Sequence, residues 1–568
     1  MTEEFRQHAP EPLEAVSFDI PKPFETVLDN GLKIVIFEDR RLPLVNIRLA
    51  FFSGESDETE ETKGLTSALA SMLNEGTKNY TSRQLAEEIE RLGAKISASA
   101  NPDFTIVSAT GLSLYTADIF RLLAEMVLRP GFPEDELKLY KQNTIENLKI
   151  QRSQPDFLAD EQTARILYGD HPYAFISPAP ADVERITRDQ LVGFHERKFI
   201  PNNAILIIVG DAEKDETLQL IKDHFGTWRT GEVEKREVPA WPERNERTLT
   251  IVDRPGSAQS NIVLGNIAIE RTNPDYFPVL VMNQILGAGA SSRIFMNLRE
   301  EKGYTYGAYS RFDTKRLAGE FEATTEVRTA VTGEALKEFF YELNRIRDEQ
   351  VGEEELRDAK NFLSGVFPIR AETQEGLTNL IVSQKLYDLP EDYLQTYRDN
   401  IAAVTSADVQ NAARKYIHPD KISIVIVGDG EEVYRQAKDF ADRIEIFDTE
   451  GNPKNMEEYI NESNEPAADV SGKWSLTLDF QGQRLPVSLA LEQTDDAVSG
   501  NLETMFGTGE INEGRVRGSK ISAVARIEFQ GQKLELSLNG AVEGDSMKGT
   551  VNTPLVPVPV DFFGTREK

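Results

Sequence analysis

The chain contains 568 residues, and its 63 lysines and arginines against 95 aspartates and glutamates give a formal net charge of −32. This charge argues against nucleic-acid and anionic-membrane partners and would attract basic peptides, and a chain of this length should divide into about two to four domains. The absence of cysteine excludes disulfides, zinc ribbons and thiol catalysis. No apolar run reaches the roughly 18 residues that a membrane-spanning helix needs.

The first part of the chain predicts an α+β domain over residues 20–232. In chain order we expect strands at 31–39 and 44–54, helices at 64–77 and 82–94, strands at 95–100 and 104–111, and helices at 116–130 and 133–153. Runs of strands that alternate with runs of helices are typical of a sheet covered by helices.

The helix expected at 64–77, with the sequence GLTSALASMLNEGT, has two contrasting faces. At about 100° per residue, the face expected in the core comprises Leu65, Leu69, Met72 and Leu73. The opposite face comprises Ser67, Ala70, Ser71 and Asn74. Their i, i+3, i+4, i+7 spacing would let two histidines and a carboxylate share a metal ion, but these side chains are not such ligands.

A second α+β domain is predicted over residues 246–445, after a charged, proline-bearing linker at 231–247. We expect strands at 248–255 and 260–269, helices at 278–287 and 291–303, strands at 305–312 and 320–327, and helices within 331–363. The two domains share a motif of a Thr-capped helix followed by a buried strand, once as ITRDQLVGFHERKFIPNNAILIIVGD, ending at Asp211, and once as VTSADVQNAARKYIHPDKISIVIVGD, ending at Asp429. A repeat this long indicates duplicated domains rather than a solenoid.

The C-terminal part, residues 470–568, changes to short alternating strands after an acidic linker. Its repeated FQGQRLPVSL and FQGQKLELSL segments and its glycine-rich turns predict a small antiparallel β-barrel or sandwich. Such a module can have a packed interior, hold a small apolar ligand or mediate docking, and we expect a packed interior.

Familiar catalytic motifs are absent. None of the five histidines pairs with another at i+4, and there is neither a G-x-S-x-G elbow nor a P-loop lysine motif. The glycine-rich stretch GAGASSR, residues 287–293, predicts a tight turn between helices rather than a nucleotide site.

Four segments together resemble the pitrilysin/insulinase family of zinc metallopeptidases: TVLDNGLKIVIFED, FFSGESDE, GLTSALASMLNEGT and LGAGASSRIFMNLREEKGYTYGAYS. The resemblance covers Phe24 to Gly430 and excludes the C-terminal module. It implies duplicated α+β domains and a zinc helix that carries H-x-x-E-H. Here Ser67 and Ser71 stand at the two histidine positions, and Ala70 stands at the general-base position.

Zinc requires three good ligands, and alanine cannot activate water. Glu146 lies near the family's third-ligand position, but one carboxylate cannot hold catalytic zinc, so we expect a solvated helix residue there. The resemblance therefore implies that this chain binds no metal or other cofactor of its own.

The resemblance also implies a substrate-contacting pair, an arginine and a tyrosine seven residues later, which Arg299 and Tyr306 match. It further implies peptide addition to the strands of residues 95–111. We therefore expect a non-catalytic, substrate-binding subunit whose Arg299 and Tyr306 complete the zinc site of a homologous H-x-x-E-H partner in a heterodimer. The alternative is a catalytically silent scaffold or peptide-binding protein of the same fold. The resemblance suggests a bacterial periplasm if a leader is removed, and the cytoplasm otherwise.

Overall fold

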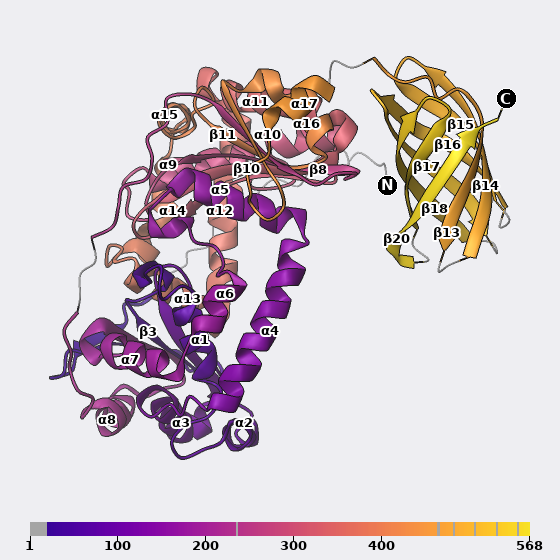
Figure 1. The fold of residues 1–568 in the computed structure, drawn as a ribbon. Coiled ribbons are helices and arrows are strands. Elements are labelled where there is room, and N and C mark those ends of the chain that lie inside the picture. Colours follow the sequence, from indigo (N-terminus) through magenta and orange to yellow (C-terminus); the bar gives the residue numbers. More distant parts are fainter. Residues whose placement is uncertain are drawn as a thin grey trace, which may run out of the picture.

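The computed structural model describes residues 20–233, 237–462, 466–480, 483–504, 507–529, 532–553 and 556–567. In these residues, two six-stranded mixed sheets with helices on their faces are followed by a closed, eight-stranded antiparallel barrel (Figure 1). The α+β fold class is confirmed, and of the two forms expected for the C-terminal module the chain adopts the barrel.

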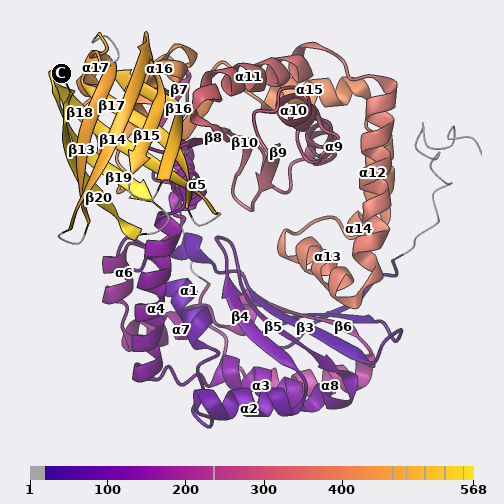
Figure 2. The same ribbon diagram turned by 90° about the vertical axis from the view of Figure 1, so that its right-hand side faces the viewer.

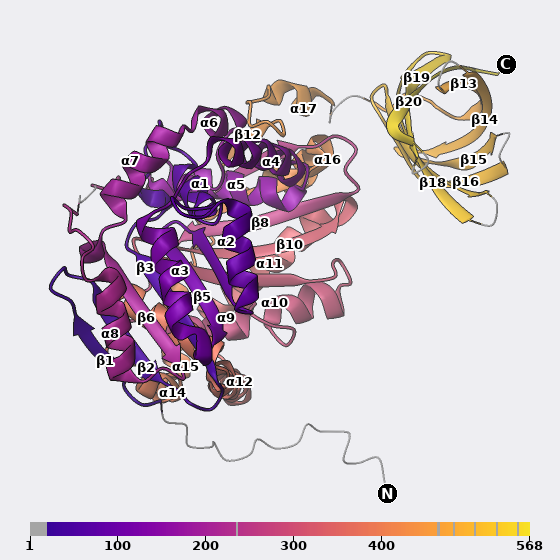
Figure 3. The same cartoon turned by 90° about the horizontal axis from the view of Figure 1, so that it is seen from below.

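The first sheet has the strand order β1-β2-β6-β3-β5-β4. Its strands are β1 (Phe24–Val27), β2 (Lys33–Glu38), β3 (Leu44–Phe51), β4 (Lys95–Ala100), β5 (Thr105–Leu112) and β6 (Ala204–Gly210). The helices of this half are α1 (Leu65–Met72), α2 (Ser82–Arg91), α3 (Thr116–Leu128), α4 (Glu134–Arg152), α5 (Pro155–Tyr168), α6 (Pro180–Arg185), α7 (Arg188–Lys198) and α8 (Lys214–Phe225), with the 3₁₀ turns η2 (Glu55–Asp57), η3 (Ser113–Tyr115), η4 (Pro172–Ala174) and η5 (Pro201–Asn203). Seen from below, α2, α3 and α8 lie over one face of the sheet (Figure 3).

The second sheet repeats this plan, with the order β12-β7-β11-β8-β10-β9. Its strands are β7 (Thr248–Asp253), β8 (Gln259–Ile267), β9 (Ala308–Thr314), β10 (Gly319–Arg328), β11 (Ser423–Gly428) and β12 (Arg443–Phe447). Its helices are α9 (Tyr276–Leu286), α10 (Arg293–Phe295), the π-helix η6 (Met296–Glu301), α11 (Thr332–Asp348), α12 (Glu353–Glu372), α13 (Gln374–Leu386), α14 (Tyr393–Ala403), α15 (Ser406–Tyr416), α16 (Gly430–Ala437) and α17 (Met456–Glu462), with the 3₁₀ turns η7 (Thr329–Val331) and η8 (Lys438–Phe440). β11 pairs parallel with β7 and antiparallel with β8, as β6 pairs with β2 and β3.

Both faces of the first sheet are covered, which explains why every residue of β6 is buried. Because side chains alternate along a strand, Leu206 and Ile208 join the core beneath α1 and α3. The intervening Ile205, Ile207 and Val209 join the larger core that includes the second half.

The two halves exchange helices. α5 lies within the first half of the sequence, before β6, but it packs on β8 and β11, where Leu158 and Ala159 join a cluster with valines of the second sheet. In return, α13 packs on β3 and β6 of the first sheet (Figure 2), and the Gln374 amide donates to the Asp39 carbonyl at 2.7 Å. The turn between β9 and β10 also reaches across, since the Arg316 amide donates to Asp103 Oδ2 at 3.0 Å. The halves therefore share the larger of the two cores.

The barrel is antiparallel throughout and closes where β13 pairs with β20. Its strands are β13 (Gly472–Phe480), β14 (Gln483–Thr494), β15 (Ala497–Thr504), β16 (Gly507–Arg517), β17 (Lys520–Phe529), β18 (Gln532–Glu543), β19 (Ser546–Thr553) and β20 (Val556–Arg566). Apolar side chains gather in its interior around Trp474, which is fully buried and donates from Nε1 to the Val470 carbonyl at 2.9 Å.

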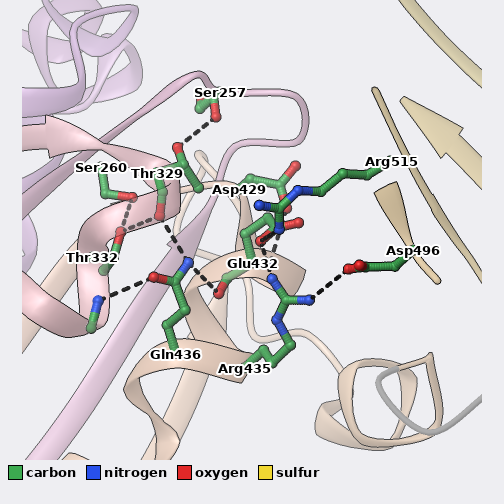
Figure 4. A network of polar contacts seen from close by, with 11 residues as sticks. Ser257, Ser260, Thr329, Thr332, Asp429, Glu432, Arg435, Gln436, Asp496 and Arg515 are labelled. Atoms are coloured by element: carbon green, nitrogen blue, oxygen red, sulfur yellow. Dashed lines mark hydrogen bonds and ion pairs between the residues drawn. The ribbon is translucent and has the colours of Figure 1, made fainter. Parts of the chain in front are cut away.

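The barrel contacts the second half through charged side chains along α16 (Figure 4). Lys520 pairs with Glu431 at 2.5 Å, Arg435 with Asp496 at 3.7 Å, and Arg515 with Glu432 at 3.8 Å. None of the helices in the described part of the chain is long and apolar enough to cross a membrane.

Candidate functional site

Helix α1 has the predicted core face. Leu65, Leu69, Met72 and Leu73 are at most 1% exposed. On the opposite face Ser67, Ser71 and Asn74 are half-buried, whereas Ala70 is only 2% exposed. A side chain larger than alanine at position 70 would therefore need space that this packing does not provide.

The N-terminus of α1 is capped from a distance by Glu58. The N-cap residue Gly64 has no side chain to perform this role and adopts a left-handed conformation, with φ of 80°. Instead, the Glu58 carboxylate accepts from the amides of Gly64 at 2.8 Å and Thr66 at 2.6 Å. Burial raises the pKa of Glu58 to about 7. Glu58 could not be identified from the sequence, because a capping residue six positions before the N-cap Gly64 leaves no local signature.

Ser67 is tied to a second buried carboxyl group. Its hydroxyl donates to Glu55 Oε1 at 2.6 Å, which joins η2 to α1. Burial raises the pKa of Glu55, and the hydrogen bond from Ser67 opposes that rise. The position that matches a family histidine thus takes part in a hydrogen bond within the chain.

The residues at the family's metal positions do not fit zinc. Ser67 is engaged by Glu55, Ala70 has no ligand atom, and Glu146 of α4 is exposed and pairs with Lys149 at 2.7 Å. Glu146 is a solvated helix residue, as expected. Among the described residues, no group of three or more histidine, cysteine, aspartate or glutamate side chains is placed to hold a metal ion.

Arg299 lies in a π-helix. The Lys302 amide donates to the Asn297 carbonyl five residues earlier, at 3.0 Å. π-Helical turns are rare and occur often at functional sites. The sequence predicted an ordinary helix at 291–303, so this local widening is a correction that the structure adds.

Hydrogen bonds and an ion pair attach α10 and the π-helix to α11 and α12. The Arg293 guanidinium forms a bidentate ion pair with Glu355 of α12: Nε donates to Oε1 and Nη2 donates to Oε2, both at 2.7 Å. The Asn297 amide donates to Glu338 at 3.1 Å and to Glu342 at 2.9 Å, both on α11. These anchors leave the Arg299 side chain 45% exposed.

Tyr306 lies in the loop between η6 and β9 and is 93% exposed. The loop is ordered by Thr305, whose hydroxyl accepts from the Gly307 amide at 3.0 Å and donates to the Gly307 carbonyl at 2.9 Å. Arg299 and Tyr306 thus lie on neighbouring segments of the second half, whereas Ser67, Ala70 and Ser71 lie on α1 in the first half (Figure 2).

Two family models match the chain. Residues 33–176 match the model described as insulinase (peptidase family M16), and residues 185–363 match the one described as peptidase M16 inactive domain. Together these ranges cover more than half of the sequence.

Curated relatives agree with this assignment. A protein of Helicobacter pylori named non-peptidase homolog YmxG is 23% identical over 405 residues, which is 70% of this chain and 91% of the relative. A protein of Bacillus subtilis named uncharacterized zinc protease YmxG is 25% identical over 283 residues, or 50% of this chain and 68% of the relative.

Solved structures show the same fold. A peptidase M16 inactive domain from Pseudomonas fluorescens is 28% identical with a TM-score of 0.67, and the match covers 72% of this chain and 98% of that one. A protease from Helicobacter pylori reaches the same TM-score at 20% identity, covering 72% of this chain and 100% of that one. With Ser67, Ala70 and Ser71 in place of the zinc motif, the chain is an inactive-type member of the insulinase family, peptidase family M16.

Proposed function

We propose that this chain is the non-catalytic, substrate-binding subunit of a heteromeric zinc metallopeptidase. Peptides would be hydrolysed at the zinc of a homologous partner that carries H-x-x-E-H. Arg299 and Tyr306 of this chain would hold the peptide there. The observation that supports this role most strongly is that both side chains are exposed on segments held in place by hydrogen bonds. Glu355, Glu338 and Glu342 bond the segment that carries Arg299, and Thr305 and Thr325 bond the carbonyl of Gly307, next to Tyr306.

The chemistry of the two side chains suits the role. A guanidinium donates to a peptide carbonyl, and a phenol hydroxyl can donate to the oxyanion that forms when water attacks that carbonyl. Neither group needs a metal of its own. Removal of one such donor typically lowers kcat by about 10²–10³.

The first half supplies a second element for peptide binding. β4 is an edge strand that pairs on one side with β5. An extended peptide could therefore add to β4 through main-chain hydrogen bonds, as proposed from the sequence for residues 95–111.

The test is a tagged pull-down of the full chain from its native cells. The eluate and the isolated chain are assayed side by side for peptide cleavage, with and without a chelator. We expect cleavage only in the eluate, abolished by the chelator, together with a partner that carries H-x-x-E-H. Complexes that contain Arg299→Ala or Tyr306→Phe should assemble normally and cleave about 10²–10³ times more slowly. Turnover equal to wild type would contradict the assigned role.

A silent scaffold is the second candidate. It is favoured by the Ser67–Glu55 hydrogen bond, which joins α1 to η2 within the chain at the place where the family binds zinc. In that case the chain is recovered alone or with unrelated proteins, and neither sample cleaves peptides.

A further inference from the structure

The loop that carries Tyr306 and the π-helix that carries Arg299 are connected through the ring of Tyr309, the second residue of β9. This ring lies 5.5 Å from the ring of Phe295, at an interplanar angle of 46°. Phe295 is only 3% exposed, and the Arg299 guanidinium lies over its ring at 4.9 Å. A contact chain therefore runs from Tyr309 through Phe295 to Arg299.

On its other side, the Tyr309 ring lies against the loop at Gly307. A Cβ atom built at residue 307 would come within 2.7 Å of Tyr309 Cε2 and within 3.1 Å of its hydroxyl oxygen. Only glycine lets the ring approach this closely. The Gly307 carbonyl is itself held, since it accepts from the hydroxyls of Thr305 at 2.9 Å and Thr325 at 3.0 Å. The ring thus rests on a fixed point next to Tyr306.

Few other forces direct the Arg299 side chain. Its ion pair with Glu300 spans 3.4 Å, and both side chains are nearly half exposed. Such a pair contributes little in water. A cation over the face of an aromatic ring is attracted by the ring quadrupole, and this attraction depends on where the cation lies relative to the ring.

We propose that Tyr309 is a positioning residue that keeps Arg299 and Tyr306 on a common surface, so that both contact one bound peptide. This inference rests on the proposed function. Tyr309 acts by wedging its ring between Gly307 and Phe295, so the ring matters and the hydroxyl does not. Its loss would leave Arg299 and Tyr306 present but wrongly oriented relative to one another.

The experiment measures binding of a fluorescein-labelled, unstructured peptide of glycine, serine and lysine to the full chain by fluorescence anisotropy. A basic peptide is chosen because the chain carries a net charge of −32. We expect Tyr309→Ala to weaken binding about tenfold and Tyr309→Phe to bind like wild type. Tyr341→Ala, an exposed tyrosine on α11, is the matched control and should change nothing.

A double-mutant cycle separates positioning from a general structural role. If Tyr309 acts through Arg299, the two substitutions are not additive. The fold-increase in Kd of the variant with both Arg299→Ala and Tyr309→Ala is then smaller than the product of the fold-increases of the two single variants. Fully additive losses would overturn the inference, as would wild-type binding by Tyr309→Ala when Arg299→Ala binds weakly. If Arg299→Ala itself binds like wild type, the proposed function at this site fails and the inference fails with it.

Gly307→Ala provides an independent test that leaves Tyr309 in place. The new Cβ must displace the ring, so binding should weaken as in Tyr309→Ala. Gly365→Ala on α12 is its control, because a Cβ there would have no atom within 4 Å. Thermal melting of every variant verifies folding. A folded Gly307→Ala protein with unchanged affinity would also overturn the inference.

Discussion

Glu58 is a buried carboxyl group that couples the capping of helix α1 to pH. Its side chain is 6% exposed and caps α1 through the amides of Gly64 and Thr66. Its pKa is raised from 4.5 to about 7 by burial, so the folded chain binds the proton more tightly than the unfolded chain does. The stability that this proton contributes is complete below pH of about 4.5 and is lost as the pH rises through 7.

We therefore predict that Glu58→Gln removes part of the decline in stability between pH 5 and pH 7.5. In the wild type, titration of Glu58 lowers the free energy of unfolding by about 2–3 kcal/mol over that interval. The measurement is the melting temperature of both proteins across this pH range. Glu146→Gln, which changes an exposed glutamate on α4, is the control and should follow the wild-type curve. Parallel curves for Glu58→Gln and wild type would show that Glu58 does not titrate in this range.

At the scale of elements, the segment α10–η6 is a rigid support for Arg299. Arg293 is 8% exposed, and its guanidinium forms a bidentate ion pair with Glu355 that fixes α10 to α12. Glu355 itself is partly exposed, so water can solvate it when Arg293 is removed. The cost of breaking the pair is therefore smaller than for a fully buried one.

We predict that Arg293→Ala destabilises the second half by about 1–3 kcal/mol and weakens peptide binding, although Arg293 is too buried to contact a peptide. Arg357→Ala breaks exposed pairs with Glu354 and Asp358 on the same helix, α12, and should leave both properties unchanged. Urea unfolding and peptide anisotropy measure the two effects. Normal affinity in a destabilised Arg293→Ala protein would show that Arg299 does not depend on this anchor.

At the scale of the whole molecule, the exchange of α5 and α13 makes the two halves interdependent. Without α13, the face of the first sheet that holds Ile205, Ile207 and Val209 is open to water. Exposure of each such side chain costs about 1.5–3 kcal/mol. The barrel differs, because its core around Trp474 is formed within residues 466–567.

We predict that a chain cut between residues 240 and 241 yields halves that co-purify when co-expressed and aggregate when expressed separately. The control cut, within residues 463–465, should release a barrel that melts cooperatively by itself. Size-exclusion chromatography and circular dichroism provide the readouts. A soluble, cooperatively melting first half alone would show that α13 is dispensable.

Local patterns determined much of what is seen. The 3.6-residue and two-residue periodicities located many of the elements but not α5, α13 or α14, and the core face of α1 at Leu65 and Leu69 was predicted correctly. The α+β class was correct too, and residue identities at Ser67, Ala70 and Ser71 were enough to show that the zinc motif is missing. These features depend on residues close together in the chain, so a single sequence contains them.

Which surfaces meet follows from the three-dimensional packing and could not be predicted from the sequence. The packing of α5 on the second sheet, closure of the barrel, the Glu55–Ser67 bond and the π-helix around Arg299 join groups that periodicity does not relate. The contact between the rings of Tyr309 and Phe295 likewise depends on a strand folding back against a helix. The physical reason is that burial and ring contacts depend on distance in space, whereas sequence patterns report only which face of its own element a residue occupies.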